Sequence, residues 1–255
     1  MAQESYQNKK NVSREEEDLN LEDLSKVWDE YAKVYDKVMQ APIYKKMADA
    51  LFESLMPCPG GIVHDGGCGI GYYFKGIFEK TQASKIIATD ISSEMISKAK
   101  KEVSKLPKEY QEKIEFYQMD LTKDWPKEMF DAQVFQFVLN YMPDRKWQKA
   151  IENAYKTTKP RGYVYSSTLF EGLSINDVAK KHTLEEGLHV PISSFVAIIK
   201  AKNIMKIFDQ LTEEKKLILP NREEYVEYHK KIGFKKIEIV KEIFWGIGAI
   251  VRAQK

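Results

Sequence analysis

Cysteine and histidine are scarce in this sequence, and their scarcity excludes two kinds of site. The 255 residues include two cysteines, Cys58 and Cys68, and four histidines that do not cluster. Two cysteines form no disulfide framework of the kind that stabilises small secreted domains, and they suit a reducing compartment. No group of cysteines and histidines has the spacing of metal ligands, so we expect no bound metal.

Long apolar runs and an excess of charge of one sign are missing as well. No apolar stretch approaches the ~20 residues of a membrane-spanning helix, and the first 20 residues lack the apolar core of a secretory signal. The 40 basic and 38 acidic residues leave a net charge of +2, which gives no general attraction to nucleic acid. We therefore expect a cytoplasmic protein with no membrane span and no nucleic-acid partner. The lysine-rich stretches 98–105 and 230–236 are interpreted as solvated helix faces, and nothing in the sequence indicates the oligomeric state.

The hydrophobic pattern divides the chain into five parts. Residues 1–20 are polar and charged and are expected to form a mobile tail. Residues 21–59 carry apolar side chains at spacings of three and four, which predicts an N-terminal helical cap. Residues 60–170 alternate between strand and helix patterns and predict the core of the fold. Residues 171–222 interrupt this alternation with two helical stretches, interpreted as an inserted lid, and residues 223–255 complete the core with a helix and two strands.

Seven strands are predicted, with helices between most of them. The strands are 61–67, 85–92, 113–121, 130–142, 163–170, 235–244 and 248–254, and the helices of the core are 72–80, 92–106, 144–158 and 222–234. This alternation indicates a mainly parallel sheet, because parallel neighbours need a long crossover and a helix usually supplies it. The last two strands are separated by only three residues, "WGI", which demands an antiparallel hairpin. The predicted fold class is α/β, a doubly wound, seven-stranded, mainly parallel sheet with an antiparallel C-terminal hairpin.

A glycine-rich turn follows the first predicted strand. "IVHDGGCGIGYYF", residues 62–74, places four glycines within six positions. In an open parallel sheet, ligands bind beyond the carboxyl ends of the strands, and bare backbone there lets a ligand approach closely. A dinucleotide site has the spacing G-x-G-x-x-G, whereas this turn has Gly67-x-Gly69-x-Gly71 with Asp65 just before it. A carboxylate at that place would repel a pyrophosphate but could hold an ammonium group, directly or through water.

These residues resemble the motif of a known family. "VHDGGCGIG" is similar to the D-x-G-x-G-x-G motif of class I, Rossmann-like S-adenosylmethionine-dependent methyltransferases, with His64 in place of the usual aliphatic residue. Later landmarks follow in the family's order: Asp90 in "IIATDIS", Asp120 in "YQMDL", the segment "FDAQVFQFVLNYM", and "TKPRGYVYSS" with an extra Arg161. The resemblance covers residues 60–170 and 222–255. It is closest to the small-molecule and quinone-biosynthesis type of the family.

The resemblance implies that S-adenosylmethionine is the cofactor, and it assigns roles to particular residues. Asp65 would hold the ammonium group, and Asp90 would accept two hydrogen bonds from the ribose diol. The other implied cofactor-binding residues are Gly67, Gly69 and Gly71 against the cofactor, Ile91, Met95 and Leu121 around the adenine, Asp120 at its amino group, the Phe135 backbone and Gln136 at the methionine end, and Tyr31 and Tyr35 on the covering N-terminal helix.

The acceptor pocket is expected between the N-terminal helix, the end of the fourth strand and the lid. Asn140 and Tyr141 would border it, with Tyr35, Phe170, Phe195 and Ile199 among its walls. A dedicated base is needed only where the acceptor must lose a proton, so no compulsory catalytic residue is expected. The candidates for such a role are His189, Tyr35 and Asn140. Of the other histidines, His64 is expected to be packed and hydrogen-bonded, and His182 and His229 to be solvated.

The sequence thus favours a methyltransferase that acts on a small or medium-sized, partly apolar acceptor. Methyl transfer to tRNA or protein is an alternative within the same class. A non-catalytic cofactor-binding or interaction protein on the same fold, and a nicotinamide-dependent dehydrogenase, are alternatives from other classes.

Overall fold

The computed structural model describes residues 21–40, 42–123, 125, 129–171, 218–243, 246 and 248–255. The expected tail at 1–20 lies outside the described residues. So does most of the expected lid, including His182, His189, Phe195 and Ile199. The expectations for these segments therefore remain predictions.

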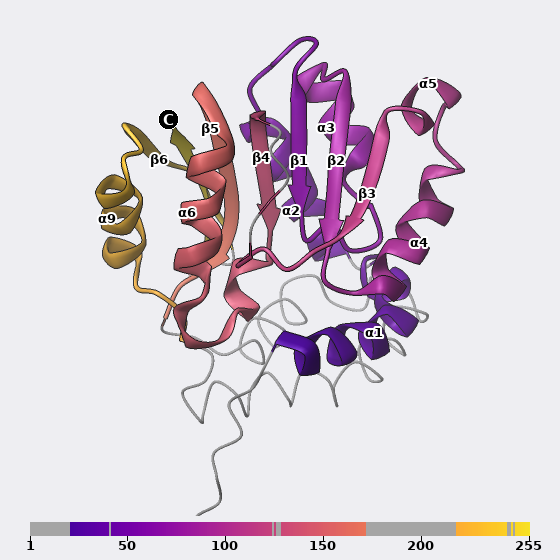
Figure 1. Ribbon diagram of the computed structural model, residues 1–255, viewed down its shortest axis with the longest axis horizontal. Helices are drawn as coiled ribbons and strands as arrows, with labels where there is room; N and C mark the ends of the chain where they lie inside the picture. The colour runs from indigo at the N-terminus through magenta and orange to yellow at the C-terminus, as the bar shows by residue number, and fades with distance from the viewer. Residues whose placement is uncertain are drawn as a thin grey trace, which may run out of the picture.

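The described residues form a seven-stranded sheet in the order β3-β2-β1-β4-β5-β7-β6 (Figure 1). The strands are β1 (Ile62–Gly66), β2 (Lys85–Asp90), β3 (Ile114–Gln118), β4 (Phe130–Gln136), β5 (Thr158–Leu169), β6 (Lys236–Ile243) and β7 (Gly248–Gln254). The pairs among β1 to β5 are parallel, and β7 runs antiparallel to both β5 and β6. The predicted fold class, including the C-terminal hairpin, is confirmed.

Helices cover both faces of the sheet. They are α1 (Leu21–Val38), α2 (Pro42–Ser54), α3 (Phe74–Thr81), α4 (Ser93–Val103), α5 (Lys108–Gln111), α6 (Trp147–Thr157) and α9 (Arg222–Ile232), with short 3-10 turns η1 (Leu139–Tyr141) and η2 (Pro143–Arg145). One hydrophobic core joins α2, α3 and α4 to one face, and a second joins α6 and α9 to the other. Helix α1 lies across the carboxyl ends of the strands (Figure 1). It therefore covers the edge where a ligand site is expected.

The alternation of side chains along β1 places His64 and Asp65 on opposite faces of the sheet. His64 is fully buried, stacks on Phe130, and hydrogen-bonds through Nδ1 to Gln133 Oε1 at 3.0 Å and through Nε2 to Thr89 Oγ1 at 2.9 Å. Burial lowers the pKa of His64 to about 4, so the ring stays neutral. The expectation that His64 is packed and hydrogen-bonded is confirmed. Asp65, the next residue, points to the opposite face of the sheet.

Three elements begin or end at residues other than those that the sequence predicts. β4 stops at Gln136, six residues before the predicted end, because Phe137 has a left-handed backbone (φ +54°) and η1 follows. β5 begins at Thr158, so the segment "KPRG", which favours a turn, instead extends the strand with a shifted register opposite Phe130 and Ala132. The helix predicted at 144–158 begins only at Trp147, after the 3-10 turn η2.

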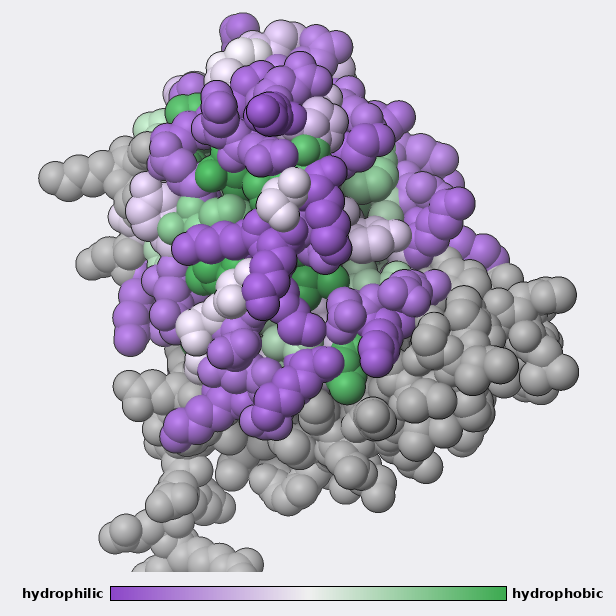
Figure 2. Space-filling view, turned by 90° about the vertical axis from the view of Figure 1, so that its right-hand side faces the viewer, coloured by the Kyte–Doolittle hydropathy of each residue, from purple (hydrophilic) through white to green (hydrophobic). Residues whose placement is uncertain are grey.

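The exposed lysines follow the expectation for solvated helix faces. The face that carries α4, α5 and the edge strand β3 is largely hydrophilic, with apolar side chains showing between the polar ones (Figure 2). Lys100, Lys101 and Lys105 on this side are exposed, and Lys105 pairs with Glu102. Lys230 and Lys231 are exposed as well, but the prediction that the neighbouring His229 is solvated is wrong. It is buried rather than solvated, with Nδ1 at 2.8 Å from the Tyr225 carbonyl oxygen and its ring against Phe234.

Candidate functional site

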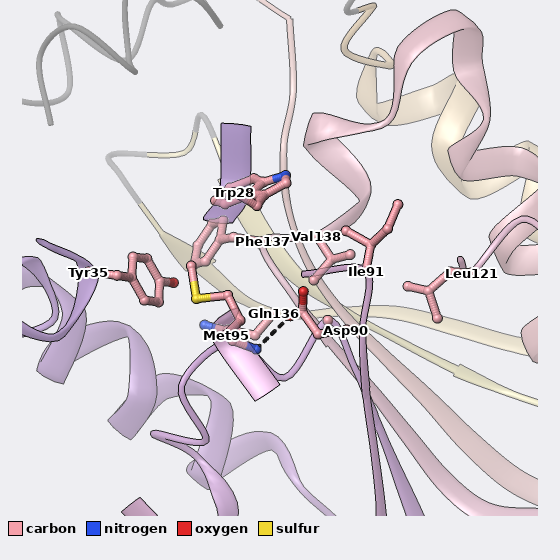
Figure 3. Close-up of a pocket in the computed structure, with 11 residues that line it drawn as sticks. Trp28, Tyr35, Asp90, Ile91, Met95, Leu121, Gln136, Phe137 and Val138 are labelled. Atoms are coloured by element: carbon pink, nitrogen blue, oxygen red, sulfur yellow. Dashed lines mark hydrogen bonds between the residues drawn. The ribbon is translucent and has the colours of Figure 1, made fainter. Parts of the chain in front are cut away.

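A cavity opens where the strand order reverses between β1 and β4. The space between its walls, counted out to where it opens into solvent, is about 520 Å³. Its lining residues come from the β1–α3 turn, the end of β2, the start of α4, the segment after β4, and α1 (Figure 3). They are Trp28, Tyr35, Gly67, Gly69, Asp90, Ile91, Met95, Leu121, Gln136, Phe137 and Val138. Eight of these residues are among those that the sequence proposes for cofactor binding.

The glycine turn has a left-handed backbone at three positions, and the glycines serve different purposes. Gly67, Gly69 and Gly71 have φ of +73°, +53° and +78°, a region that other residues adopt at a cost. A Cβ on Gly67 would lie 2.2 Å from Val138, and one on Gly71 would lie 2.4 Å from Phe74, so these two glycines are required by the protein's own packing. A Cβ on Gly69 would meet only Tyr35, at 3.3 Å. Gly69 is therefore the position where the backbone is kept bare toward the cavity.

Asp90 sits at the end of β2 and faces the cavity with its backbone contacts in place. Its Oδ2 accepts a hydrogen bond from the Gly69 N–H at 2.8 Å (Figure 3). Its Oδ1 accepts one from the Ser92 N–H at 2.9 Å. Ser92, not Asp90, caps α4, through a bond from the Met95 N–H to its hydroxyl at 3.0 Å. Burial raises the pKa of Asp90 to about 6, although the backbone N–H groups lower it. The carboxylate is thus fixed in orientation and directed at the cavity.

Asp65 is a buried carboxylate without a partner. It is 1% exposed, and neither of its oxygens has a hydrogen-bond partner among the described residues. Burial, together with the charge of Asp90, raises the pKa of Asp65 to about 7. Asp65 is not one of the residues that line the cavity, but the charge of Asp90 disfavours its ionisation, and a positively charged ligand nearby would stabilise the ionised form.

Helix α1 is tied to the loop that carries Asp90 and Ile91. The Ser25 hydroxyl donates to the Ile91 carbonyl oxygen at 3.1 Å. Asp29 accepts a hydrogen bond from the Ser92 hydroxyl at 2.5 Å and one from the Glu94 N–H at 3.3 Å, at the start of α4. The helix that covers the cavity is therefore bonded to the same turn that carries Asp90.

Aromatic rings on α1 form the cover. Trp28 packs edge-on against Tyr141 with ring centroids 5.1 Å apart, and Tyr35 packs against Tyr31 at the same separation. Tyr35 reaches the cavity, while Tyr31 is buried in the core behind it. Burial raises the pKa of Tyr35 well above its ordinary value, so its hydroxyl stays protonated at neutral pH and cannot serve as a base there.

The other proposed site residues lie around the cavity but do not line it. Asp120 Oδ1 accepts hydrogen bonds from the Thr122 N–H and hydroxyl, at 2.8 and 2.7 Å, and its buried Oδ2 has no hydrogen bond among the described residues but lies 3.9 Å from Lys123 Nζ. The Phe135 ring is fully buried against Gly66 on the far face of the strand. Asn140 is buried at the ends of β4 and β5, and Phe170 packs against Tyr225 in the second core.

Three lining residues were not proposed from the sequence as cofactor-binding residues: Trp28, Phe137 and Val138. Trp28 belongs to an apolar helical stripe and gives no separate signal. Phe137 and Val138 were assigned to a strand that would have continued to residue 142. The left-handed backbone at Phe137 ends the strand and brings these two side chains to the cavity.

The strand order, the glycine turn after β1 and the acid at the end of β2 define the fold as that of the class I S-adenosylmethionine-dependent methyltransferases. Residues 63–162 match the family model described as a methyltransferase domain. The resemblance seen in the sequence is thereby confirmed for the core.

A curated relative and several solved structures resemble the chain. Malonyl-[acyl-carrier protein] O-methyltransferase from Anoxybacillus flavithermus (strain DSM 21510 / WK1) is 32% identical over 145 residues, which are 57% of this chain and 52% of the relative. The chain thus matches about half the length of that relative. A complex of DhpI with SAH has a TM-score of 0.61 at 19% identity, covering 92% of this chain and 96% of that one. Magnesium protoporphyrin IX methyltransferase from Synechocystis PCC 6803 with bound SAM has a TM-score of 0.51 at 14% identity, covering 86% and 80%. These two structures show a common fold.

The described residues also bear on two other features, a membrane-spanning helix and a metal site. No described helix is long and apolar enough to cross a membrane. Within the same part of the chain, no three or more His, Cys, Asp and Glu side chains gather as a metal site.

Proposed function

We propose that the protein is an S-adenosylmethionine-dependent methyltransferase that methylates an oxygen of a small or medium-sized, partly apolar acceptor. The observation that carries the proposal is the pair of buried acids beside the bare Gly69 backbone. Neither oxygen of Asp65 has a hydrogen-bond partner among the described residues, and Asp90 faces the cavity with a fixed carboxylate. A ligand with a cationic end and a diol could interact with both acids.

The lining of the cavity fits the rest of this cofactor. Ile91, Met95 and Leu121 form an apolar slot next to Asp90, suited to a flat base. Gln136 also lines the cavity, with its Oε1 accepting from the Ser167 hydroxyl and its buried Nε2 meeting no hydrogen-bond acceptor in good geometry among the described residues. Such an amide N–H₂ suits the cofactor carboxylate. A nicotinamide dinucleotide fits less well, because its pyrophosphate would face the two acids.

The contribution of this chain is to bind, orient and exclude water. When bound, S-adenosylmethionine supplies a methyl group on a sulfonium centre, which an acceptor takes by in-line displacement. Trp28 and Tyr35 on α1 cover the cavity, so that water is kept from the reacting atoms. Among the described lining residues, Asp90 and Tyr35 are the titratable ones. Asp90 is committed to the ribose and Tyr35 stays protonated, so neither is a general base.

Transfer to oxygen is supported by the curated relative, which is named as an O-methyltransferase. The partly apolar character of the acceptor is supported by the cover of aromatic and aliphatic side chains, Trp28, Phe137 and Val138.

Calorimetric titration with S-adenosylhomocysteine and with NADH tests the cofactor. We expect binding of the first and none of the second, and the reverse would refute the proposal. A screen with radiolabelled methyl groups against a cell extract, separated into protein, RNA and small molecules, then tests the acceptor. Label in the RNA or protein fraction alone would establish the macromolecular alternative, and binding without transfer would establish a non-catalytic protein.

A further inference from the structure

Asn140 is a buried amide with half of its hydrogen-bonding capacity unused. It lies in η1, four residues after the last residue of β4, and is 6% exposed. Its Oδ1 accepts a hydrogen bond from the Thr168 hydroxyl at 2.7 Å and one from the Leu169 N–H at 3.1 Å, both at the end of β5. Its Nδ2 is buried and has no partner among the described residues. A buried donor left unpaired is destabilising, so such a group calls for an explanation.

The orientation of this amide is fixed by its neighbours. The Leu169 N–H can only donate, so the atom that faces it must be the amide oxygen and not the nitrogen. With both lone pairs of Oδ1 occupied, the two N–H groups of Nδ2 must point away from β5. Asn140 therefore offers two donors and no acceptor to anything that lies beside it.

The turn η1 lies next to the cavity, although Asn140 itself is not one of the lining residues. Residues 136–138, which immediately precede η1, line the cavity. Tyr141, which follows Asn140, packs against Trp28 in the cavity cover. Gln136, the last residue of β4, is held in a similar way, because its oxygen accepts from the Ser167 hydroxyl on β5. Two neighbouring residues of β5, Ser167 and Thr168, thus each hold the oxygen of one buried amide.

The chemistry of a free N–H₂ pair defines what it can bind. It accepts a carboxylate or carbonyl oxygen and gives no partner to an ammonium group. Hydrogen bonds to an ionised oxygen are the stronger kind. An acid is also ionised at neutral pH, so it would need no base, and the described cavity lining supplies none.

We infer that the Nδ2 group of Asn140 binds an oxygen of the methyl acceptor, and that this acceptor carries a carboxylate or carbonyl group. The inference rests on the proposed function and refines its acceptor class. Asn140 is a positioning residue for the acceptor oxygen, and Thr168 is the residue that orients it.

A matched set of fragments tests the inference without knowledge of the natural acceptor. The probes are 3-phenylpropanoate, 3-phenylpropan-1-ol and 3-phenylpropylamine. Each is titrated into the 255-residue protein with and without S-adenosylhomocysteine, and binding is followed by ligand-observed NMR. We expect the carboxylate to bind most tightly and the amine least. Asn140→Asp keeps the bonds from Thr168 and Leu169 but replaces the donors with an acceptor. It should weaken carboxylate binding by about 10-fold or more, the size of one hydrogen bond to a charged group, and favour the amine.

Control variants separate this effect from charge and from folding. Asn221→Asp makes the same substitution at the exposed N-cap of α9, where either side chain accepts from the Glu224 N–H, so the fragment ranking should not change. If Asn140→Asp does not fold, Thr168→Val, which removes one of the two bonds that orient the amide, should reduce the preference for carboxylate severalfold. The inference is overturned if the wild-type protein shows no preference for carboxylate, or if Asn140→Asp or a folded Thr168→Val keeps the full preference.

The titration of S-adenosylhomocysteine separates this inference from the proposed function. Failure of the wild-type protein to bind that ligand would refute the proposed function. The fragment ranking in the free protein would then still decide the role of Asn140.

Discussion

Replacing Asp65 by asparagine should make the protein more stable at pH 8 while weakening its cofactor site. The wild-type carboxyl group is 1% exposed, lacks hydrogen-bond partners and has a pKa raised to about 7. Between pH 4 and pH 7 the folded state therefore retains a proton that the unfolded state has lost, and the free energy of unfolding must fall as the pH rises through this range. Asparagine carries no proton to lose and escapes this penalty.

The size of the effect follows from the pKa. Each pH unit over which the two states differ by one proton changes stability by about 1.4 kcal/mol. The two units between pH 5 and pH 7 therefore predict that the advantage of Asp65→Asn over the wild type grows by about 3 kcal/mol from pH 5 to pH 8.

Urea unfolding at pH 5 and pH 8 measures this difference, with Asp49→Asn on the exposed face of α2 as the control that should show no such growth. Calorimetry of the same variant with S-adenosylhomocysteine should show weakened binding. If the stability difference between Asp65→Asn and the wild type does not change with pH, or if the variant is less stable at pH 8, then ionised Asp65 does not destabilise the folded protein. The argument from its unpaired oxygens would then fail.

Three further predictions concern the same cavity. Asp90→Ala should weaken S-adenosylhomocysteine binding by about 2–3 kcal/mol, the range for hydrogen bonds to a charged group, and unchanged affinity in calorimetry would remove Asp90 from the site. Gly69→Ala should weaken binding at least tenfold, whereas the control Gly60→Ala should leave affinity unchanged. Gly60 has a similar φ of +71° and open space around it, so this substitution should only lower the free energy of unfolding, by about 1 kcal/mol. Equal effects of the two substitutions on binding would place Gly69 outside the site. Binding should also release protons near pH 6.5, because a cationic ligand lowers the raised pKa of Asp65. Calorimetric enthalpies that do not depend on the ionisation heat of the buffer would contradict this.

The sheet was predictable because two independent signals agreed. Strand and helix patterns alternated along residues 60–170, and the three-residue link before the last strand excluded a parallel pair. The glycines and Asp65 stood out because they crowd one turn, and Asp90 stood out because the family that the sequence resembles has an acid at the end of its second strand. For Asp90 and Gly69 the structure adds the geometry that links them, a 2.8 Å hydrogen bond that no spacing in the sequence reveals.

What the sequence did not reveal depends on single backbone angles and on packing at long range. A left-handed phenylalanine is uncommon, so "FDAQVFQFVLNYM" indicates one long strand, and the end of β4 at Gln136 could not be predicted. His229 stands among lysines, but α9 turns it toward Tyr225 and Phe234. The unpaired donors of Asn140 depend on the neighbouring strand, because only the position of Leu169 fixes the direction of the amide.

The bonds from Ser25 and Asp29 to the turn after β2 have a thermodynamic consequence. A ligand held by Asp90 and the docked state of the first helix must reinforce each other to the same degree in both directions. Amide hydrogens along residues 24–38 should therefore exchange more slowly once the crevice is filled, and Asp29→Ala should abolish much of that slowing while it loosens the ligand.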